Sequence, residues 1–331
     1  AAGRTGLPAW AGPAGAACAT VLASSGAKVV LVAGGPTRPP VVEVLDPVVP
    51  TLLGAIGARG SLESAGLVRC LSRVVAWTGS GPVTNDPVAN PYGPAWIVDR
   101  AHFDTLLVAH AGASGADRVR ARGCRVEREG AVWRLDCGIR ARLLVQAQGR
   151  TAHLVGDSAR QHPGDDHSFA ILAELPAARP TGSFELLRTA TGWWYAATLS
   201  RDRATVAYVT DPGKIPRDPS VRRSWWWGEL SRSGLANQYP YLPETRLVAR
   251  PAHGSLRAEL AGDTWCCVGD AASTYDPITG QGVATAIAKG TALGRLLGSH
   301  SPEAAFSAYA AAERESFEAY STTRRAYLRA A

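Results

Sequence analysis

The sequence predicts an α/β fold in which a three-layer domain is interrupted by a mainly antiparallel β domain. Three observations support this expectation. A glycine turn, an alanine-rich helix and a buried strand follow one another over residues 12–32, four strands occupy residues 169–210, and a strand, a glycine-rich loop and a helix occupy residues 264–297. With 331 residues, 46% of them hydrophobic, the chain can bury a large core, which excludes a disordered chain or a small disulfide scaffold.

The first half of the chain mixes helices and strands. An alanine-rich helix is expected to follow the turn at residues 12–15 and to end at Gly26, and the β-branched run 28–32 is typical of a buried parallel strand. A helix is expected near residues 48–56, and the segment 96–100 leads into a helix over 101–113. Strands at 118–120, 124–126, 131–135 and 141–145 predict an antiparallel meander that returns to the sheet.

The second half contains the strands 169–175, 183–190, 192–199 and 204–210, which predict a separate sheet covered on one face. A buried strand at 264–268, a helix at 283–297 and a last helix at 302–328 follow. We therefore assign residues 1–75, 96–155 and 245–300 to the α/β domain, residues 76–95 and 156–244 to a substrate domain, and residues 301–331 to a C-terminal helix.

Composition narrows the possible functions. The net charge of +7 comes mostly from dispersed arginines, so nucleic-acid binding is not expected. The six cysteines lack CxxC spacing, and we interpret them as small buried hydrophobic residues rather than as metal ligands or disulfides. No apolar run reaches the roughly 18 residues of a membrane-spanning helix, and no signal peptide is recognisable, so a cytoplasmic protein without a membrane span is expected.

Two glycine-rich segments precede helices and carry chemistry. Residues 12–15 let the backbone approach a pyrophosphate, whose charge the helix N-terminus favours. Asp270 follows the second buried strand and can accept hydrogen bonds from a polyol. Residues 280–282 expose backbone N–H groups at another helix N-terminus, which suits a ring oxygen that becomes anionic on reduction.

These motifs resemble the FAD-dependent monooxygenases of the p-hydroxybenzoate-hydroxylase type, within their branch of halogenase-like and geranylgeranyl-reductase-like proteins. The resemblance covers most of the chain and includes the segments 98–107 and 192–197. Residues 320–327 look like the end of the subgroup that modifies tryptophan in quinone-cofactor enzymes. The resemblance implies a Rossmann-like FAD-binding domain and the following cofactor-binding residues: Gly12, Pro13, Ala14, Gly15, Arg100, Gly269, Asp270, Pro277, Gly280, Gln281 and Gly282.

In this family the pyrophosphate would lie at Gly12 and Gly15, Arg100 would lie near the ribityl phosphate, Asp270 would bind the ribitol, and residues 277–282 would line the isoalloxazine ring. NAD(P)H would reduce the flavin by transient docking. Reduced flavin would then take up O2 as a C4a-(hydro)peroxide that oxygenates an aromatic ring. A small aromatic molecule or a peptide- or protein-borne tryptophan is the expected substrate, and Trp193, Trp194 and Tyr195 are candidate pocket residues, although a packed sheet face also selects aromatics.

Four residues depart from the family pattern on the AMP–pyrophosphate side. Trp10 replaces the first glycine, Ala33 replaces the ribose-binding acid, and Gln146 and Gln148 alter a third motif. Either the protein binds FAD weakly or not at all, or its amino-terminal sequence is altered, as the absence of methionine also suggests. A degenerate flavoprotein-fold module that acts as a non-catalytic maturation partner is therefore an alternative.

Two other branches of the family remain as further alternatives. A flavin-dependent halogenase needs a lysine between flavin and substrate, and none of the three lysines lies in the expected segment, so this activity is disfavoured. A prenyl reductase needs a long apolar tunnel, whereas the aromatic middle sheet favours an aromatic substrate. No catalytic base is identified from the sequence, because lone histidines are usually surface or core residues.

Overall fold

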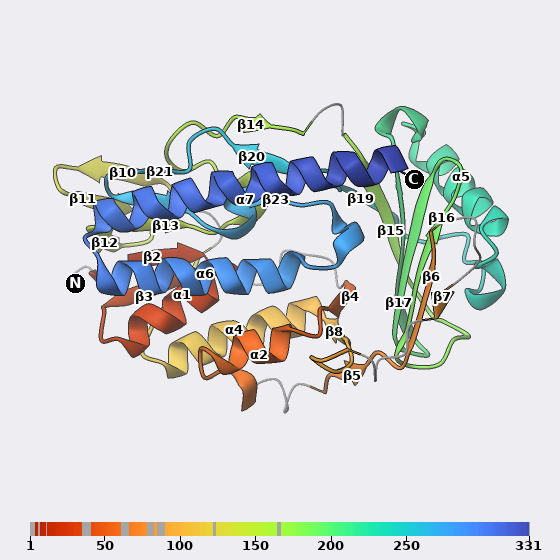
Figure 1. The fold of residues 1–331 in the computed structure, drawn as a ribbon, viewed down its shortest axis with the longest axis horizontal. Helices are drawn as coiled ribbons and strands as arrows, with labels where there is room; N and C mark the ends of the chain where they lie inside the picture. The colour runs from red at the N-terminus through yellow and green to blue at the C-terminus, as the bar shows by residue number, and fades with distance from the viewer. Residues whose placement is uncertain are drawn as a thin grey trace.

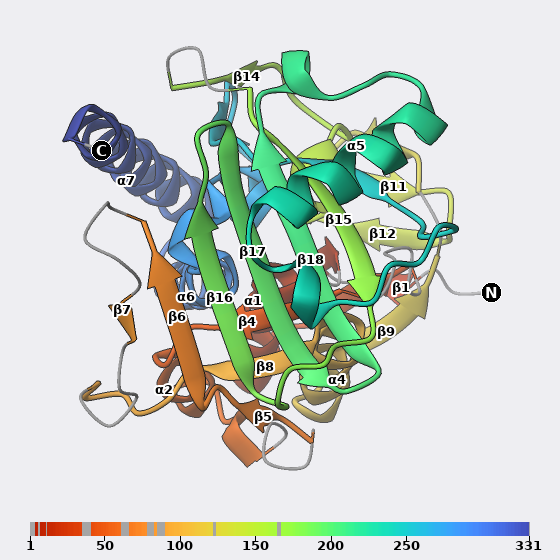
Figure 2. The same ribbon diagram turned by 90° about the vertical axis from the view of Figure 1, so that its right-hand side faces the viewer.

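The computed structural model describes residues 4–330 except 6, 11, 35–40, 61–65, 78–82, 85–89, 122–123 and 164–166. Figure 1 shows a stack of helices and short strands beside a large sheet, and Figure 2 shows that sheet face on, with one helix across its outer face. This arrangement confirms the predicted mixed α/β fold with a mainly antiparallel second part.

A central parallel sheet forms the core of the first part. β2 pairs with β3, β3 pairs with β9, and β13 lies beside β2 and pairs with β22, all in parallel. β21 adds an antiparallel edge to β22. The strands span Leu7–Trp10 (β2), Val29–Ala33 (β3), Asp117–Arg120 (β9), Leu144–Gln146 (β13), Ala261–Gly262 (β21) and Trp265–Cys267 (β22).

Helices cover this sheet, and small residues let two of them, α1 and α6, pack closely together. Helix α1 packs tightly on α6, and both contribute to the apolar core around Cys18, Leu31 and Leu293. Figure 1 shows α7 running alongside α6 toward the large sheet. The helices are α1 (Pro13–Ser24), α2 (Val49–Gly54), α4 (Arg100–Ala113), α6 (Gly282–Ser299) and α7 (Pro302–Ala330).

The predicted meander is correct in its middle and wrong at its two ends. β10 (Val126–Glu129), β11 (Val132–Leu135) and β12 (Ile139–Ala141) form the antiparallel hairpins, and β1 (Arg4–Thr5) pairs with β12. β9 instead joins the parallel sheet. The expected strand 141–145 divides, because the chain leaves the meander after Ala141 and enters the central sheet as β13.

The second part is a seven-stranded sheet of order β19-β15-β18-β17-β16-β6-β7. Its four central strands are those predicted from the sequence, and helix α5 (Pro219–Arg232) covers its outer face (Figure 2). The strands are β6 (Ser72–Ala76), β7 (Val83–Thr84), β15 (Phe169–Leu175), β16 (Ser183–Arg188), β17 (Gly192–Ser200), β18 (Arg203–Thr210) and β19 (Val248–Pro251).

Two strands next to the predicted domain boundaries at residues 75 and 245 belong to the large sheet. β6 pairs in parallel with β16, and β19 pairs with β15, so both strands join the large sheet although most of their residues were assigned to the α/β domain. Two smaller sheets complete the fold. One contains β4 (Val42–Leu45), β5 (Val68–Arg69) and β8 (Trp96–Asp99), and the other contains β14 (Arg160–Gln161), β20 (Ser255–Arg257) and β23 (Ser273–Thr274).

The cysteines are free thiols, and five of the six are buried. Among the described residues, one group of potential metal donors comes together, where Cys124, Asp136 and Cys137 place their ligand atoms within 4.8 Å of one another. Three donors fall short of the four protein ligands of a structural zinc site. In the described part of the chain, no helix is both long and apolar enough to cross a bilayer.

Candidate cofactor and substrate cavity

A cavity of about 300 Å³ lies between the α/β part and the seven-stranded sheet. The start of α1, strand β4, the start of α4, the loop before α6 and the inner face of the sheet all contribute to its wall. The predicted cofactor residues that line it are Gly12, Pro13, Ala14, Arg100, Asp270, Pro277, Gly280 and Gly282. Segments far apart in the sequence thus converge on one space.

The N-terminus of α1 opens onto this cavity without a capping side chain. Gly12 is the N-cap residue, and no acidic residue lies in the first turn. The N–H groups of the first turn have no acceptor within the helix, so they are available to an anion. Gly15 is buried within the same turn and is not part of the cavity wall.

Two glycines allow the loop before α6 and α6 itself to approach α1. Gly269 has a φ of +62°, and a Cβ there would lie 2.7 Å from the Cβ of Ala14. A Cβ at Gly290 would collide with the carbonyl group of Ala14. Only glycine permits both the backbone conformation at residue 269 and the helix contact at residue 290.

The N-terminus of α6 reaches the same cavity. Gly280 is left-handed, with a φ of +65°, and Gln281 is the N-cap residue but gives no capping side-chain hydrogen bond. Gly280 and Gly282 line the cavity, whereas Gln281 is not part of its wall. Two helix N-termini therefore direct positive partial charge into one space.

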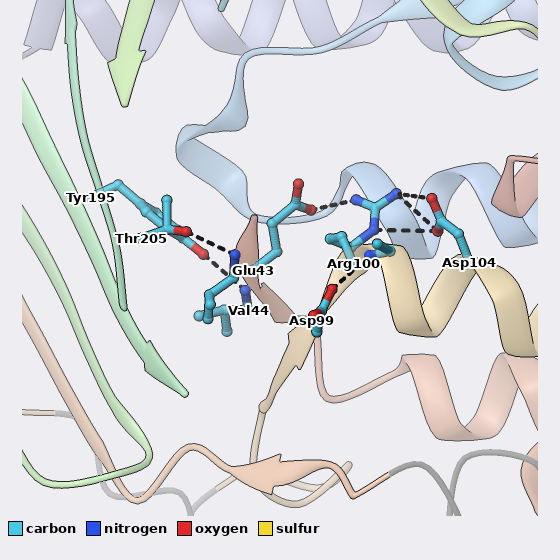
Figure 3. Close-up of polar contacts among 9 residues, drawn as sticks. Glu43, Val44, Asp99, Arg100, Asp104, Tyr195 and Thr205 are labelled. Carbon is cyan, nitrogen blue, oxygen red and sulfur yellow. Dashed lines mark hydrogen bonds and ion pairs between the residues drawn. The ribbon is translucent and has the colours of Figure 1, made fainter. Parts of the chain in front are cut away.

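Arg100 lies at the cavity wall but is held by protein carboxylates. Its guanidinium bonds Glu43 on one side and Asp104, at 3.2 Å, on the other (Figure 3). Burial opposes the charged form, but the two carboxylates outweigh this effect and raise the pKa of Arg100. The role of Arg100 near the ribityl phosphate stays a prediction, and the structure shows its guanidinium bonded to two acids.

Glu43 is a cavity residue that the sequence analysis missed. Its strand, β4, is fixed to the large sheet by two hydrogen bonds: the Val44 N–H donates to the Tyr195 hydroxyl at 2.8 Å, and the Val42 N–H donates to the Thr205 hydroxyl at 2.7 Å (Figure 3). Burial raises the pKa of Tyr195 far above its ordinary value. A single acidic residue within an apolar strand was the available sequence signal.

The three aromatic candidates of β17 divide between the two faces of the sheet. Trp193 and Tyr195 line the cavity, beside Ala207 and Val209 of β18. Trp194 points the other way, because successive strand residues alternate between faces. It is fully buried, stacks on Tyr208 with ring centroids 4.6 Å apart and contacts Trp226 of α5. The expectation that Trp194 contributes to the pocket is therefore wrong for this cavity.

Helix α7 holds the loop that carries the second glycine motif. Arg324 bonds Asp276 at 3.2 Å, and the Tyr320 hydroxyl accepts the Asp276 N–H at 2.9 Å. Lys289 of α6 bonds Glu313 of α7 and does not line the cavity. Helix α7 thus holds the loop before α6 in position through these two contacts with Asp276.

Arginines surround the Asp270 side of the cavity. Arg150 lines it, and Arg160 donates to backbone carbonyls of residues 270 and 271. Burial, together with the nearby charges of Arg150 and Arg257, lowers the pKa of Arg160 to about 10, although Asp270 opposes the shift. An anion would relieve this concentration of positive charge.

The residues that depart from the family pattern have mixed surroundings. Gln146 is fully buried and bonds the backbone of residues 154 and 155, so its amide serves the fold. Gln148 has buried amide atoms that find no partner in the described part of the protein. Ala33 ends β3 without a carboxylate, and the side chain of Trp10 lies outside the described residues.

Comparison with known proteins agrees with this architecture. No family model matches the sequence. The putative FAD-dependent oxidoreductase LodB of Marinomonas mediterranea is 27% identical over 229 residues, which are 64% of this chain and 61% of LodB. The chain thus spans less than two thirds of that curated relative.

Solved structures align over almost the whole chain. The peptidyl tryptophan dihydroxylase QhpG is 25% identical, with a TM-score of 0.74, over 97% of this chain and 76% of QhpG. The myxobacterial chondrochloren halogenase CndH is 20% identical, with a TM-score of 0.81, over 98% of this chain and 82% of CndH. PqsL of Pseudomonas aeruginosa, a probable FAD-dependent monooxygenase, is 19% identical, with a TM-score of 0.73, over 96% of this chain and 94% of PqsL. In fold and in sequence, the chain resembles FAD-dependent oxidoreductases and monooxygenases.

Proposed function

We propose that this protein is an FAD-dependent monooxygenase that hydroxylates an aromatic ring, with a tryptophan side chain of a peptide or partner protein as the preferred substrate. The observation that supports this function is the cavity itself. It joins two uncapped helix N-termini to the aromatic face formed by Trp193 and Tyr195. A cofactor and an aromatic substrate would therefore meet in the same cavity.

The residues present fit FAD. The free N–H groups at the start of α1 and the nearby Arg150 suit a pyrophosphate, and Asp270 suits a sugar alcohol. Pro277, Gly280 and Gly282 line the cavity, and the uncapped start of α6 offers backbone N–H donors to a ring system. Bound FAD, reduced by transiently docked NAD(P)H, would supply the oxygen-transfer chemistry, while the protein orients the substrate and excludes water.

The preference for tryptophan rests on two observations. The cavity face of the sheet is apolar and aromatic, with Ala170, Leu172 and Val209 beside the two aromatic rings. QhpG, which aligns over 97% of this chain, is described as a peptidyl tryptophan dihydroxylase. Halogenation is less favoured, because Lys289 is bonded to Glu313 and lies outside the cavity wall.

The test begins with the full-length protein mixed with excess FAD. We expect a bound-flavin absorbance spectrum, NAD(P)H-dependent O2 uptake and a mass gain of one or two oxygen atoms on a tryptophan-containing peptide. Gly298→Ala, on α6 outside the cavity wall and with open space for a Cβ, is the control and should leave these three measurements unchanged. Absence of flavin binding at saturating FAD would refute the proposed function.

A non-catalytic maturation partner with the same fold is the second candidate, because Ala33 offers no carboxylate to a ribose at the end of β3. Ala33→Glu distinguishes the two candidates. For the monooxygenase, this substitution is expected to tighten FAD binding. A protein that binds no FAD before or after the substitution, yet forms a stable complex with its partner, would favour the non-catalytic function.

A further inference from the structure

We propose that Glu43 determines substrate specificity, accepting a hydrogen bond from the ring N–H or O–H of the aromatic substrate that lies against Trp193 and Tyr195. This inference rests on the proposed function, which supplies the aromatic substrate. It adds that the substrate ring must carry a hydrogen-bond donor, and it names Glu43 as the residue that accepts this hydrogen bond. An indole N–H is the matching donor for a tryptophan substrate.

The position of Glu43 is fixed from both sides. β4 pairs with β8 along one edge, and its backbone N–H groups reach the hydroxyls of Tyr195 and Thr205 on the large sheet along the other. The Glu43 side chain extends from β4 and lines the cavity. A carboxylate on a rigid strand can orient a ligand more precisely than one on a loop.

One oxygen of Glu43 is occupied and the other is available. Oε2 bonds Arg100, and Figure 3 shows the second oxygen directed away from that guanidinium. Among the described residues, no hydrogen bond reaches Oε1, and the side chain keeps 36% of its surface exposed. Oε1 of Glu43 is therefore available to accept a charge-assisted hydrogen bond from a donor in the cavity.

The other carboxylates of the cavity are less suited to this role. Asp276 uses one oxygen for the Ile278 N–H and the other for Arg324. Asp270 lies among Arg150 and Arg160, on the side that we assign to the cofactor. Of these three cavity carboxylates, Glu43 is the one whose own strand is hydrogen-bonded to the aromatic sheet.

The test compares the binding of indole and 1-methylindole, which differ by the ring donor, to the full-length protein with and without FAD. For the unmodified protein, we expect indole to bind about 10- to 100-fold more tightly, the range for a hydrogen bond to a charged group. Glu43→Gln should abolish most of this preference while leaving the affinity for FAD and for 1-methylindole unchanged. Glu315→Gln, at an exposed position on α7, is the matched control.

Each alternative result is distinct. If both probes bind equally, or neither binds, the proposed role of Glu43 is overturned. If Glu43→Gln weakens FAD binding and leaves the ratio of the two probe affinities unchanged, Glu43 is a cofactor contact. If the unmodified protein does not bind FAD, the monooxygenase function is refuted. The preference for indole over 1-methylindole is also measured without FAD, so the role of Glu43 is judged separately.

Discussion

Arg324, on the C-terminal helix α7, forms an ion pair with Asp276, in the loop before α6, with 3.2 Å between Nη2 and Oδ2. Both side chains are largely buried, and Asp276 directly precedes Pro277 of the cavity wall. The last helix of the chain thus sets the position of the loop that faces the proposed flavin. This relationship joins residues 48 positions apart in the sequence.

Replacement of Arg324 should therefore affect cofactor binding at a distance. Arg324→Met removes this buried ion pair with Asp276, and we expect a loss of about 1–3 kcal/mol in unfolding free energy. Weaker FAD binding should accompany it. Urea unfolding and FAD titration measure the two effects, and Arg314→Met, at an exposed site on the same helix, is the control. An unchanged FAD affinity would show that the loop holds its position without α7.

The contact between α1 and α6 gives a second prediction. Gly290→Ala places a methyl group against the carbonyl of Ala14, so we expect a loss of about 1–3 kcal/mol in stability and weaker FAD binding at the displaced helix N-terminus. Gly298→Ala, on the same helix but in open space, should be neutral or stabilising. Thermal unfolding and FAD titration of both variants test this contrast. Equal behaviour of the two variants would contradict the tight helix contact.

The two neighbouring tryptophans of β17 should differ sharply when truncated. Trp194→Ala removes a fully buried ring between Tyr208 and Trp226, for which we expect a loss of about 3–5 kcal/mol. Trp193→Ala should cost much less stability and should instead weaken binding of the aromatic substrate, because Trp193 lines the cavity. Chemical denaturation and indole titration separate the two effects. Similar losses of stability in both variants would argue against the placement of Trp193 and Trp194 on opposite faces of the sheet.

Asp99 links the two parts of the fold in a pH-dependent way. Its carboxylate caps α4 and accepts a hydrogen bond from Arg203 at 2.7 Å. Burial alone would raise the pKa of Asp99, but Arg203 and the backbone N–H groups of α4 outweigh burial and lower it. Because the pKa of Asp99 is lower in the folded state, its ionised carboxylate stabilises the folded protein. This stabilisation is fully present at pH values above the ordinary aspartate pKa of about 4. This stabilisation is lost as the pH falls through the lower, folded-state value.

The corresponding variant is Asp99→Asn, which cannot ionise. We expect it to be less stable than the unmodified protein at pH 7, and the difference should shrink in acid below the folded-state pKa of Asp99. Urea unfolding of both proteins across this pH range measures the difference. A difference that does not vary with pH would show that the hydrogen-bonding geometry, rather than the charge, stabilises this link.

Local sequence signals predicted most of the elements. The glycine turns at residues 12–15 and 280–282, the alanine-rich helices and the apolar strands were identified because their patterns depend on neighbouring residues alone. The expected strand 141–145 shows where such local signals fail. Its apolar residues suit both the meander and the central sheet, and only the pairing partners divide it into β12 and β13.

By itself, the sequence determined the fold class, the order of the elements and the two glycine motifs that meet at the cavity. The tertiary structure decided which aromatic ring faces that cavity, since Trp193, Trp194 and Tyr195 are all aromatic and the alternation alone does not tell the inner face from the outer one. It also paired Glu43 with Arg100 and Asp276 with Arg324. Such contacts join residues that are distant in the chain, and they form only when packing of the apolar core brings their backbones together.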